Sequence, residues 1–538
     1  MEVRRMYKLG IDVGGTNTDA VLIDENRRVV AEVKHPTSGD IYDGIVGAVR
    51  DVLARADVDR AEIRQAMLGT TQCTNAIVER KNLAPIGILR IGAPATLGIP
   101  PMVDWDEDIC RIAVDYAIVG GGFEYDGKEL AAFDRDAARR FFEGLKGKVQ
   151  SVAISCVFST VRNDHELEAA ALCREVMGED VHVSISSEIG SMGLIERENA
   201  AILNAALYQV AERFTEGFAR SLAEEGVINA DVYLSQNDGT LMTMEYARRY
   251  PILTIACGPT NSIRGASYLS RFTDAVVIDV GGTTTDLGMI QNGFPRESGV
   301  AVTIGGVRTN FRMPDVISIG GVRTNFRMPD VISIGLGGGS IVRCHEDGSV
   351  TVGPDSVGYR IAEKALVFGG DTMTATDVAV RLGMADLGDS SLVAGISEET
   401  ARKAMDVIRA MIEDSIDAMK VSGADIDAVL VGGGSIIVPE QLAGTRKVVK
   451  PDHFGTANAI GSAISKVSGT LEQLINYDEI PREEALKKAR AEAIELAVKS
   501  GAVRETVEII DVEDVPLAYY PGNTNRVKIK AAGDLADA

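Results

Sequence analysis

Residues 12–19 read Asp-Val-Gly-Gly-Thr-Asn-Thr-Asp, and residues 279–286 repeat the pattern as Asp-Val-Gly-Gly-Thr-Thr-Thr-Asp. Apolar runs of β type flank each copy, so each copy predicts a strand, a glycine turn and a second strand. Glycine pairs permit positive φ angles and leave backbone N–H groups free of side chains. Such amides, together with threonine hydroxyls, form a nest suited to phosphate. Two matched loops, one in each half of the chain, predict two similar lobes that close on one polyphosphate. The alternative is a pair of ordinary β-hairpins.

Each loop would supply phosphate-binding groups and a carboxylate. The candidates for holding phosphate through backbone N–H groups and hydroxyls are Gly14, Gly15, Thr16, Thr18, Gly281, Gly282 and Thr283. An aspartate at a strand end can organise a hydrated magnesium ion or orient a nucleophile. We therefore predict that Asp12 and Asp279 are the catalytic carboxylates and also the Mg²⁺ ligands. Asp19 and Asp286 are expected to hold their own hairpins, with a metal role as the alternative.

Two later glycine turns each follow an apolar strand, as SIGLGGGSIVR at 333–343 and as AVLVGGGSIIVP at 428–439. A glycine-rich turn lets a flat base and its ribose approach the backbone closely. The expected contacts of the adenosine of ATP are Gly432, Gly433 and Gly434, and the expected cleft-lining residues of the earlier turn are Gly337 and Gly338. The alternative for both segments is a plain tight turn.

Candidates for the substrate side come from two other segments. In LGTTQCTNAIVERK, Thr70, Thr71 and Asn75 lie in a polar turn between a predicted strand and a predicted helix. They either face the substrate or cap the helix. Arg197 is a further substrate-side candidate. Arg197 and Arg264 are also the candidates for the cation that neutralises a transferred phosphoryl group, and an ordinary ion pair is the alternative for each.

Composition limits the class of protein. A chain of 538 residues is too long for one hydrophobic core. Its formal net charge of −23 argues against a nucleic-acid partner or an anionic membrane surface. No apolar run reaches the ~18 residues of a membrane span, and no apolar signal core precedes the first strand. The six cysteines are scattered without a CxxC pair, which favours a reducing cytoplasm over a disulfide framework or a zinc site.

The order of predicted elements indicates an α/β protein. Apolar strands alternate with helices between 133 and 189, which favours a parallel sheet. Residues 93–135 are rich in Gly, Pro and Asp and are predicted to be irregular. From 469 onward a helix and two strands predict a small α+β appendage. The predicted domains are a first lobe at 1–190, a second lobe at 191–468 and the appendage at 469–538.

A fifteen-residue segment occurs twice without a change, at 304–318 and at 319–333. An old structural repeat would have diverged, so a recent duplication or an artefact is the simpler explanation. We expect the second copy to hold the native strand register, because it connects directly to the first GGGS turn.

With the paired loops and the late glycine turn, the chain resembles the actin-like ATPase superfamily of sugar kinases, actins and heat-shock chaperones. Within it, the chain closely resembles the A subunit of the hydantoinase/oxoprolinase family over roughly residues 7–465. The motifs that carry the resemblance include GIDVGGTNTDAVLID, LGTTQCTNAIVERK, IERENAAILNAAL, SQNDGTLM, CGPTNSIRGA, VIDVGGTTTDLGMI and VLVGGGS. The resemblance implies two actin-like, ribonuclease H-like lobes around a nucleotide cleft.

The resemblance also implies a function, namely ATP-dependent hydrolysis of a cyclic amide such as a hydantoin, a lactam or oxoproline. Phosphorylation of the amide carbonyl oxygen would create a leaving group and permit ring opening. The implied cofactors are ATP and Mg²⁺, and the implied partner is a hydantoinase B-type subunit, with a homo-oligomer as the alternative. Competing functions are a small-molecule kinase of the same fold, an ATP-using carboxylase accessory subunit, and a non-metabolic ATPase that acts as a chaperone or activator.

Overall fold

The first lobe is built on a sheet in which an antiparallel hairpin is joined by parallel strands. In the computed structural model, residues 6–36, 41–103, 105–190, 193–296, 330–517 and 522–536 are described, together with Tyr520 and three short strands at 303–304, 317–319 and 322–324. The sheet order is β3-β2-β1-β4-β9. The strands are β1 (Tyr7–Val13), β2 (Asn17–Ile23), β3 (Val29–Pro36), β4 (Ile63–Thr70) and β9 (Asp231–Ser235). Strands β4 and β9 run parallel to β1, whereas β2 and β3 form the antiparallel side.

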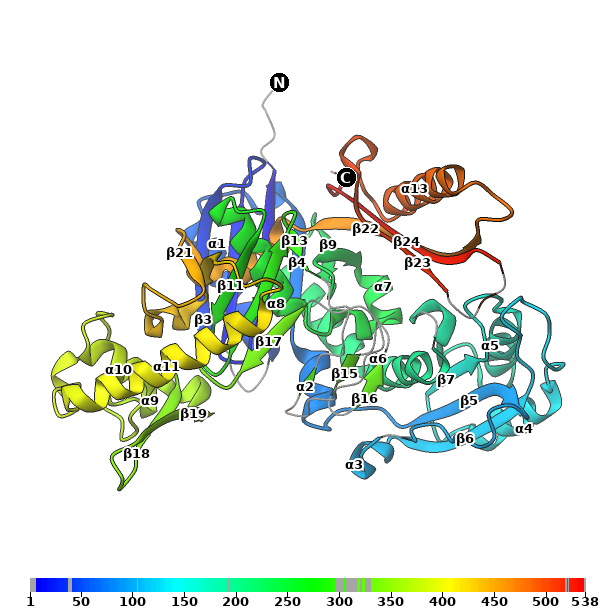
Figure 1. The fold of residues 1–538 in the computed structure, drawn as a ribbon, viewed down its shortest axis with the longest axis horizontal. Helices are drawn as coiled ribbons and strands as arrows, with labels where there is room; N and C mark the ends of the chain where they lie inside the picture. The colour runs from blue at the N-terminus through cyan, green and yellow to red at the C-terminus, as the bar shows by residue number, and fades with distance from the viewer. Residues whose placement is uncertain are drawn as a thin grey trace.

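The second lobe repeats this order as β12-β11-β20-β21, with β13 and β17 both pairing with β12. Its strands are β11 (Ala275–Val280), β12 (Thr285–Gln291), β13 (Phe294–Pro295), β17 (Val331–Ile334), β20 (Ile426–Val431) and β21 (Thr445–Val449). The two predicted hairpins have the same register. Asp12 lies opposite Asp19 in the first, and Asp279 lies opposite Asp286 in the second. The predicted α/β fold of two similar lobes is therefore present (Figure 1).

Helices cover the two sheets and connect them. The first lobe carries α1 (Ile41–Arg55), α2 (Gln72–Val78), α6 (Leu194–Glu224) and α7 (Met244–Arg249), and the second carries α9 (Ile361–Lys364), α10 (Ala375–Arg381) and α11 (Glu398–Met419). A two-stranded sheet, β18 (Ser340–Cys344) and β19 (Val350–Ser356), joins the second lobe beside α11. Separate apolar cores lie beneath the helices of each lobe, which is why each lobe forms a compact body.

Two short helices pass between the lobes and pack against each other. Helix α8 (Cys257–Ser270) leads into β11, and α12 (Ala457–Ala463) leads into the strand β22 (Lys466–Asn476). A Cβ atom added to Gly265 would lie 1.8 Å from the carbonyl oxygen of Ala457, and one added to Gly461 would lie 1.8 Å from that of Asn261. The helix backbones therefore approach so closely that only glycine fits at either position.

A third unit lies to the side of the first lobe, at the lower right of Figure 1. Its four parallel strands, in the order β6-β5-β7-β8, are β5 (Ile86–Ala93), β6 (Ala113–Gly120), β7 (Ser151–Cys156) and β8 (His182–Ile185), and its helices are α3 (Glu107–Cys110), α4 (Arg135–Leu145) and α5 (Asp164–Met177). Strand β6 lies in the segment that was predicted to be irregular, so that prediction was wrong there. A fully buried ion pair between Arg90 and Glu198 joins this sheet to α6.

The C-terminal segment extends the sheet of the first lobe. The strands of this segment follow one another in the order β10 (Thr240–Thr243), β22, β24 (Thr524–Gly533) and β23 (Glu508–Pro516), each paired with the next. Helix α13 (Arg482–Lys499) packs on these strands. The result is one nine-stranded sheet. The domain boundaries stay a prediction. This sheet nevertheless crosses the boundary predicted after residue 190, because β9 and β10 lie beyond it. It also crosses the boundary predicted after residue 468, because the strands of the appendage pair with the sheet of the first lobe.

The duplicated segment contributes one strand to the second lobe. Strand β17, at the end of the second copy, pairs with β12, and Asp330 forms an ion pair with Arg296. The second copy thus supplies the strand before the GGGS turn, as expected. The short strands β14 (Thr303–Ile304), β15 (Ile317–Ile319) and β16 (Val322–Thr324) form a separate small sheet, and most of the first copy lies outside the described residues.

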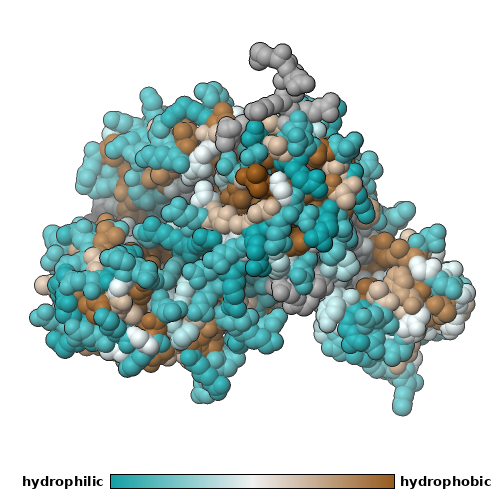
Figure 2. Space-filling view, turned by 180° about the vertical axis from the view of Figure 1, so that it is seen from behind, coloured by the Kyte–Doolittle hydropathy of each residue, from teal (hydrophilic) through white to brown (hydrophobic). Residues whose placement is uncertain are grey.

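Hydrophilic side chains predominate on the face in Figure 2, and the hydrophobic ones lie in small groups among them. A surface rich in hydrophilic side chains agrees with the many charged residues behind the net charge of −23. Within the described ranges, no helix has the length and apolarity needed to cross a membrane.

The close crossing of α8 and α12 leads to a test of the fold. We expect Gly265→Ala to lower the thermal unfolding midpoint, because the added methyl group must displace the backbone at Ala457; overpacking of this kind costs about 1–3 kcal/mol. The matched control is Gly144→Ala in α4, where an added Cβ meets nothing within 4 Å. The control should be neutral or stabilising, because alanine favours a helix. An unchanged midpoint for Gly265→Ala would contradict the close crossing.

Candidate functional site

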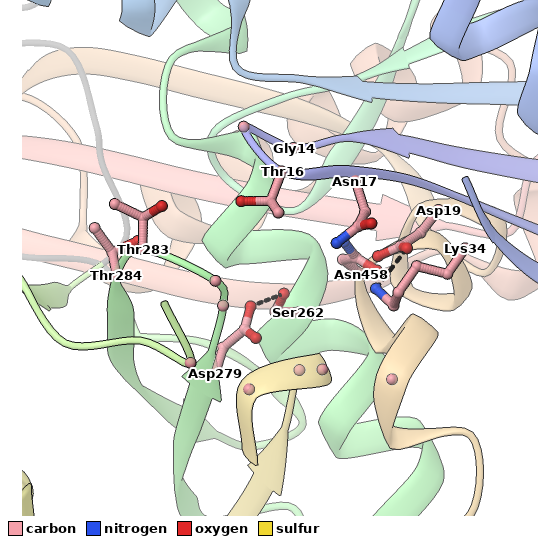
Figure 3. A pocket seen from close by; sticks show the side chains of 18 of the residues that line it. Gly14, Thr16, Asn17, Asp19, Lys34, Ser262, Asp279, Thr283, Thr284 and Asn458 are labelled. Atoms are coloured by element: carbon pink, nitrogen blue, oxygen red, sulfur yellow. Dashed lines mark hydrogen bonds and ion pairs between the residues drawn. The ribbon is translucent and has the colours of Figure 1, made fainter. Parts of the chain in front are cut away.

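A cavity of about 390 Å³ lies between the two lobes and is lined by both glycine hairpins. This volume falls in the usual range for a small-ligand site. Figure 3 shows the loop of the first lobe, with Gly14 and Thr16, facing Thr283 and Thr284 of the second. The predicted residues that line this cavity are Asp12, Gly14, Gly15, Thr16, Thr71, Asp279, Gly281, Gly282, Thr283, Gly338, Gly432, Gly433 and Gly434.

The two loops have the same internal geometry. The Gly14 N–H donates to the Asn17 carbonyl oxygen at 3.0 Å, and the Gly281 N–H donates to the Thr284 carbonyl oxygen at 2.9 Å. They also lie close to each other, since a Cβ added to Gly282 would be 2.9 Å from Oγ1 of Thr16. The two anion-binding loops predicted from the sequence therefore meet at one cavity.

The aspartates at the ends of β1 and β11 both line this cavity, where Asp12 is buried and Asp279 is half-buried. Asp12 accepts hydrogen bonds from Nδ2 of Asn261 at 3.1 Å and Nδ2 of Asn458 at 3.0 Å. Asp279 accepts one from the Ser262 hydroxyl. Burial raises the pKa of Asp12 to about 6, and the neighbouring carboxylates add to the rise, while the Asn261 amide opposes it. Burial likewise raises the pKa of Asp279.

A glycine in the neighbouring parallel strand or turn makes room for each aspartate. A Cβ added to Gly69, which lies opposite Asp12 on β4, would be 2.2 Å from Oδ1 of Asp12. A Cβ added to Gly432, just after β20, would be 2.2 Å from Oδ1 of Asp279. Both lobes thus use the same arrangement to accommodate a buried carboxylate beside the phosphate loop.

Sequence reasoning missed the basic residue of the site, Lys34. Its Nζ lies 2.6 Å from Oδ1 of Asp19, which is its cross-strand neighbour on β2. Among the described residues that line the cavity, Lys34 is the one basic side chain, and it faces four acidic ones. Asp19 and Asp286 both line the cavity, beyond the structural role expected of them, and burial raises the pKa of Asp286 to about 6.

The structure places the two predicted arginines away from the cavity. Arg197 lies on α6, where its Nη2 donates to the Cys156 carbonyl oxygen at 2.7 Å and its Nε donates to Oγ of Ser186. Arg264 donates to the Gly293 carbonyl oxygen at 2.9 Å and stacks over Phe294. Both hold structural elements together, so the ion-pair or structural alternative describes them better than a contact with phosphate.

The remaining predicted residues divide between the cavity wall and its support. Thr70 and Thr18 are buried in strands behind the loops, and Asn75 lies on the surface, where it donates to Oγ1 of Thr71 at 3.4 Å. Gly337 packs against the second loop, since its Cβ would be 2.6 Å from the Gly282 carbonyl carbon. Thr71 is the predicted substrate residue that lines the cavity.

One wall of the cavity is apolar and was not predicted. It consists of Ile361, Phe368, Leu387 and Ile436. Ile361 also lies near the glycine turns, since a Cβ added to Gly338 would be 3.9 Å from both Ile361 Cδ1 and Gly434 Cα. A flat aromatic base fits such a surface, because apolar side chains and bare glycine backbone can contact its faces.

The donors of the cavity suit Mg²⁺ bound together with a phosphate. In the part of the chain that the structure describes, no three His, Cys, Asp or Glu side chains are grouped to hold a metal ion. Magnesium commonly needs only one or two carboxylates, with phosphate oxygens and water completing its shell. Asp12 and Asp279 match that requirement, whereas a metal site made by the protein alone does not fit.

Two regions of this chain match one protein family, and two known proteins are similar to the chain in sequence. The hydantoinase/oxoprolinase N-terminal region matches residues 8–177, and the hydantoinase/oxoprolinase domain matches residues 197–420. Caprolactamase subunit alpha of Pseudomonas jessenii is 26% identical over 499 residues, which cover 88% of this chain and 67% of that protein. The acetone carboxylase beta subunit of Xanthobacter autotrophicus is 24% identical over 453 residues, covering 77% and 59%.

Solved structures show the same fold. The ATP-dependent caprolactamase from Pseudomonas jessenii superposes with a TM-score of 0.76 at 20% identity, covering 98% of this chain and 88% of that one. Nucleotide-free acetone carboxylase gives a TM-score of 0.69 at 16% identity, covering 99% and 88%. With both family regions matched in order and the paired loops in place, the chain belongs to the hydantoinase/oxoprolinase family.

Proposed function

We propose that this chain binds ATP with Mg²⁺ in the cavity between its lobes and uses it to hydrolyse a cyclic amide. The observation that carries the proposal is the meeting of two glycine loops at one cavity that Asp12 and Asp279 also line. The names of the relatives support the substrate class, because caprolactamase acts on a lactam and its structure is described as ATP-dependent.

The lining of the cavity suggests how the nucleotide would lie. Phosphates would contact the backbone N–H groups of both loops, as in other glycine-rich anion nests. The base would lie against the apolar wall of Ile361 and Phe368, next to the glycine turns. Four acidic side chains against one lysine leave the cavity negative, so a polyphosphate needs accompanying cations. Mg²⁺ held by Asp12 and Asp279 would supply that positive charge.

The chemistry required of the protein is positioning and charge neutralisation. An amide carbonyl carbon is a poor electrophile. Transfer of the terminal phosphoryl group forms a bond from phosphorus to the carbonyl oxygen and breaks the bond to ADP. Water can then attack the activated carbon, and the ring C–N bond breaks as its nitrogen takes a proton, which leaves an acyl phosphate. A second water hydrolyses the acyl phosphate to the carboxylate and inorganic phosphate. The two loops would align the phosphates, and Lys34 would stabilise the charge that develops during transfer.

A partner subunit is part of the proposal. The relatives are named as the alpha subunit of caprolactamase and the beta subunit of acetone carboxylase, so both are components of larger enzymes. We propose that a B-type subunit binds this chain and completes ring opening. The second candidate, an accessory subunit of an ATP-using carboxylase, is favoured by the acetone carboxylase relative, and it predicts ATP use that depends on a ketone and bicarbonate.

The main proposal is tested by ADP release. We expect lactams, hydantoins or oxoproline to stimulate ADP release when the purified chain is combined with the candidate partner. Asp12→Asn and Asp279→Asn should each reduce the rate about 100-fold or more, because each removes a charge that positions the phosphates. Asp274→Asn is the control, since Asp274 is exposed just before β11. Stimulation by ketones alone would favour the carboxylase, and full activity in both variants would overturn the assigned roles.

Lys34 gives a second prediction. Lys34→Met should lower kcat about 100-fold, because the one basic side chain of the cavity is lost. The substitution also leaves Asp19 without its ion pair, so Lys34→Met combined with Asp19→Asn is needed. If the double variant recovers the activity, Lys34 serves only to neutralise Asp19, and the catalytic role is wrong. Lys487→Met, on the exposed face of α13, is the control.

The half-buried carboxylate of Asp286 gives a pH prediction. Burial raises its pKa from 3.8 to about 6, with help from Asp279 and against the Ser333 hydroxyl. The folded state therefore binds the proton more tightly than the unfolded state, and stability falls as pH rises from about 4 to 6. Without metal or nucleotide, Asp286→Asn should be more stable than wild type at pH 7 by about 3 kcal/mol. The gap should close below pH 4. Thermal unfolding across this range measures it, and a constant gap would contradict the raised pKa.

A further inference from the structure

Two consecutive residues of α8 each bond the key aspartate of a different lobe. Nδ2 of Asn261 donates to Asp12 at the end of β1, and the Ser262 hydroxyl donates to Asp279 at the end of β11. Both side chains are buried, at 0% and 2% exposure, so solvent does not compete for these bonds. One turn of a single helix therefore connects the carboxylates of the two lobes, and Figure 3 shows the Ser262 bond.

The surrounding backbone is shaped around this connection. A Cβ added to Gly69 would lie 2.4 Å from Nδ2 of Asn261, directly against the hydrogen bond to Asp12. A Cβ added to Gly461 would lie 1.8 Å from the Asn261 carbonyl oxygen. The strand on one side and α12 on the other thus leave little freedom for Asn261. From α12, Asn458 adds a second donor to Asp12.

Burial of the Asn261 side chain also has a free-energy cost that no hydrogen bond to its oxygen offsets. Among the described residues, its Oδ1 is a buried oxygen with no hydrogen-bond partner. Leaving a buried acceptor unsatisfied costs about 1–3 kcal/mol, so stability alone does not explain an asparagine here. The donor half of the same amide is used on Asp12. An unsatisfied buried group beside a candidate active site indicates that the position serves function.

We propose that Asn261 and Ser262 are positioning residues that set the separation of the Asp12 and Asp279 carboxylates. The inference rests on the proposed function, in which both carboxylates organise Mg²⁺ and phosphate. Because α8 is one continuous helix, moving the lobes apart must break one of the two bonds. Helix α8 thereby holds the lobes in the arrangement where both phosphate loops reach the same ligand.

The test separates positioning from simple stability. Ser262→Ala removes the donor to Asp279, and we expect kcat to fall about 10- to 100-fold, since small misplacement of catalytic groups has effects of this size. The apparent Mg²⁺ affinity should weaken, while the KM for ATP changes little because the loop backbone is intact. Ser262→Thr keeps the hydroxyl and should restore the rate. Asn261→Asp replaces the donor with a repelling oxygen and should act like Ser262→Ala.

The control is Ser267→Ala on the same helix, where the lost hydrogen bond is to the Phe272 carbonyl oxygen at 2.9 Å, away from both aspartates. Calorimetric binding of ADP with Mg²⁺ to every variant supplies a readout besides activity. If the wild type binds no nucleotide, the proposed function fails and this inference fails with it. If the wild type binds nucleotide and Ser262→Ala matches both wild type and Ser267→Ala in Mg²⁺ affinity and kcat, the positioning role alone is wrong. If Ser262→Ala unfolds, Asn261→Asp decides the question. The positioning role is then wrong if Ser262→Thr is active and Asn261→Asp folds with the kcat and Mg²⁺ affinity of the wild type.

Discussion

The site depends on two carboxylates, Asp12 and Asp279, that are buried or half-buried in one cavity with two further acids. Burial removes water that would otherwise stabilise their charge, and like charges add to the cost. The chain offsets this cost with a few amide and hydroxyl donors and with one lysine paired to Asp19. That compensation is partial, as the raised pKa values show. In the proposed function, a polyphosphate with Mg²⁺ would bring the cations that offset this charge.

The two lobes repeat the geometry of this site but not its chemistry. Each has the same hairpin register, the same loop hydrogen bond and a glycine that makes room for the aspartate. The donors differ, because α8 and α12 pass between the lobes once each and approach the two aspartates from different sides. Asp12 receives two amide groups, whereas Asp279 receives a hydroxyl. The matched loops thus line one cavity from non-equivalent surroundings.

The sequence predicted those parts of the site that are encoded locally. The glycine loops, the strand-end aspartates and the late GGG turn are contiguous motifs with a direct physical reason for each residue. Lys34 was not predicted because it lies beside Asp19 only through the pairing of β2 with β3. A single lysine in a predicted strand belongs to no recognisable motif. The apolar wall comes from separate segments, and Arg197 was misjudged because a buried arginine in a motif resembles a ligand-binding one. The sheet crossed the predicted boundaries because β22 to β24 return to the first lobe by long-range pairing, which composition does not reveal.

The direction of the proposed nucleotide limits where specificity can arise. The apolar wall of Ile361, Phe368, Leu387 and Ile436 belongs to the second lobe, so the base of the proposed nucleotide would lie there. The cavity is also lined by Thr71 and by Gly258 and Pro259 at the start of α8. Gly258 lies near Thr71, since a Cβ added to Gly258 would be 3.8 Å from Cγ2 of Thr71. In the proposed reaction the amide must approach the terminal phosphate beside this group, where α2 leads on to the β5–β8 unit. The choice of substrate is then a property of the first lobe and its partner, while nucleotide binding is a property of both lobes.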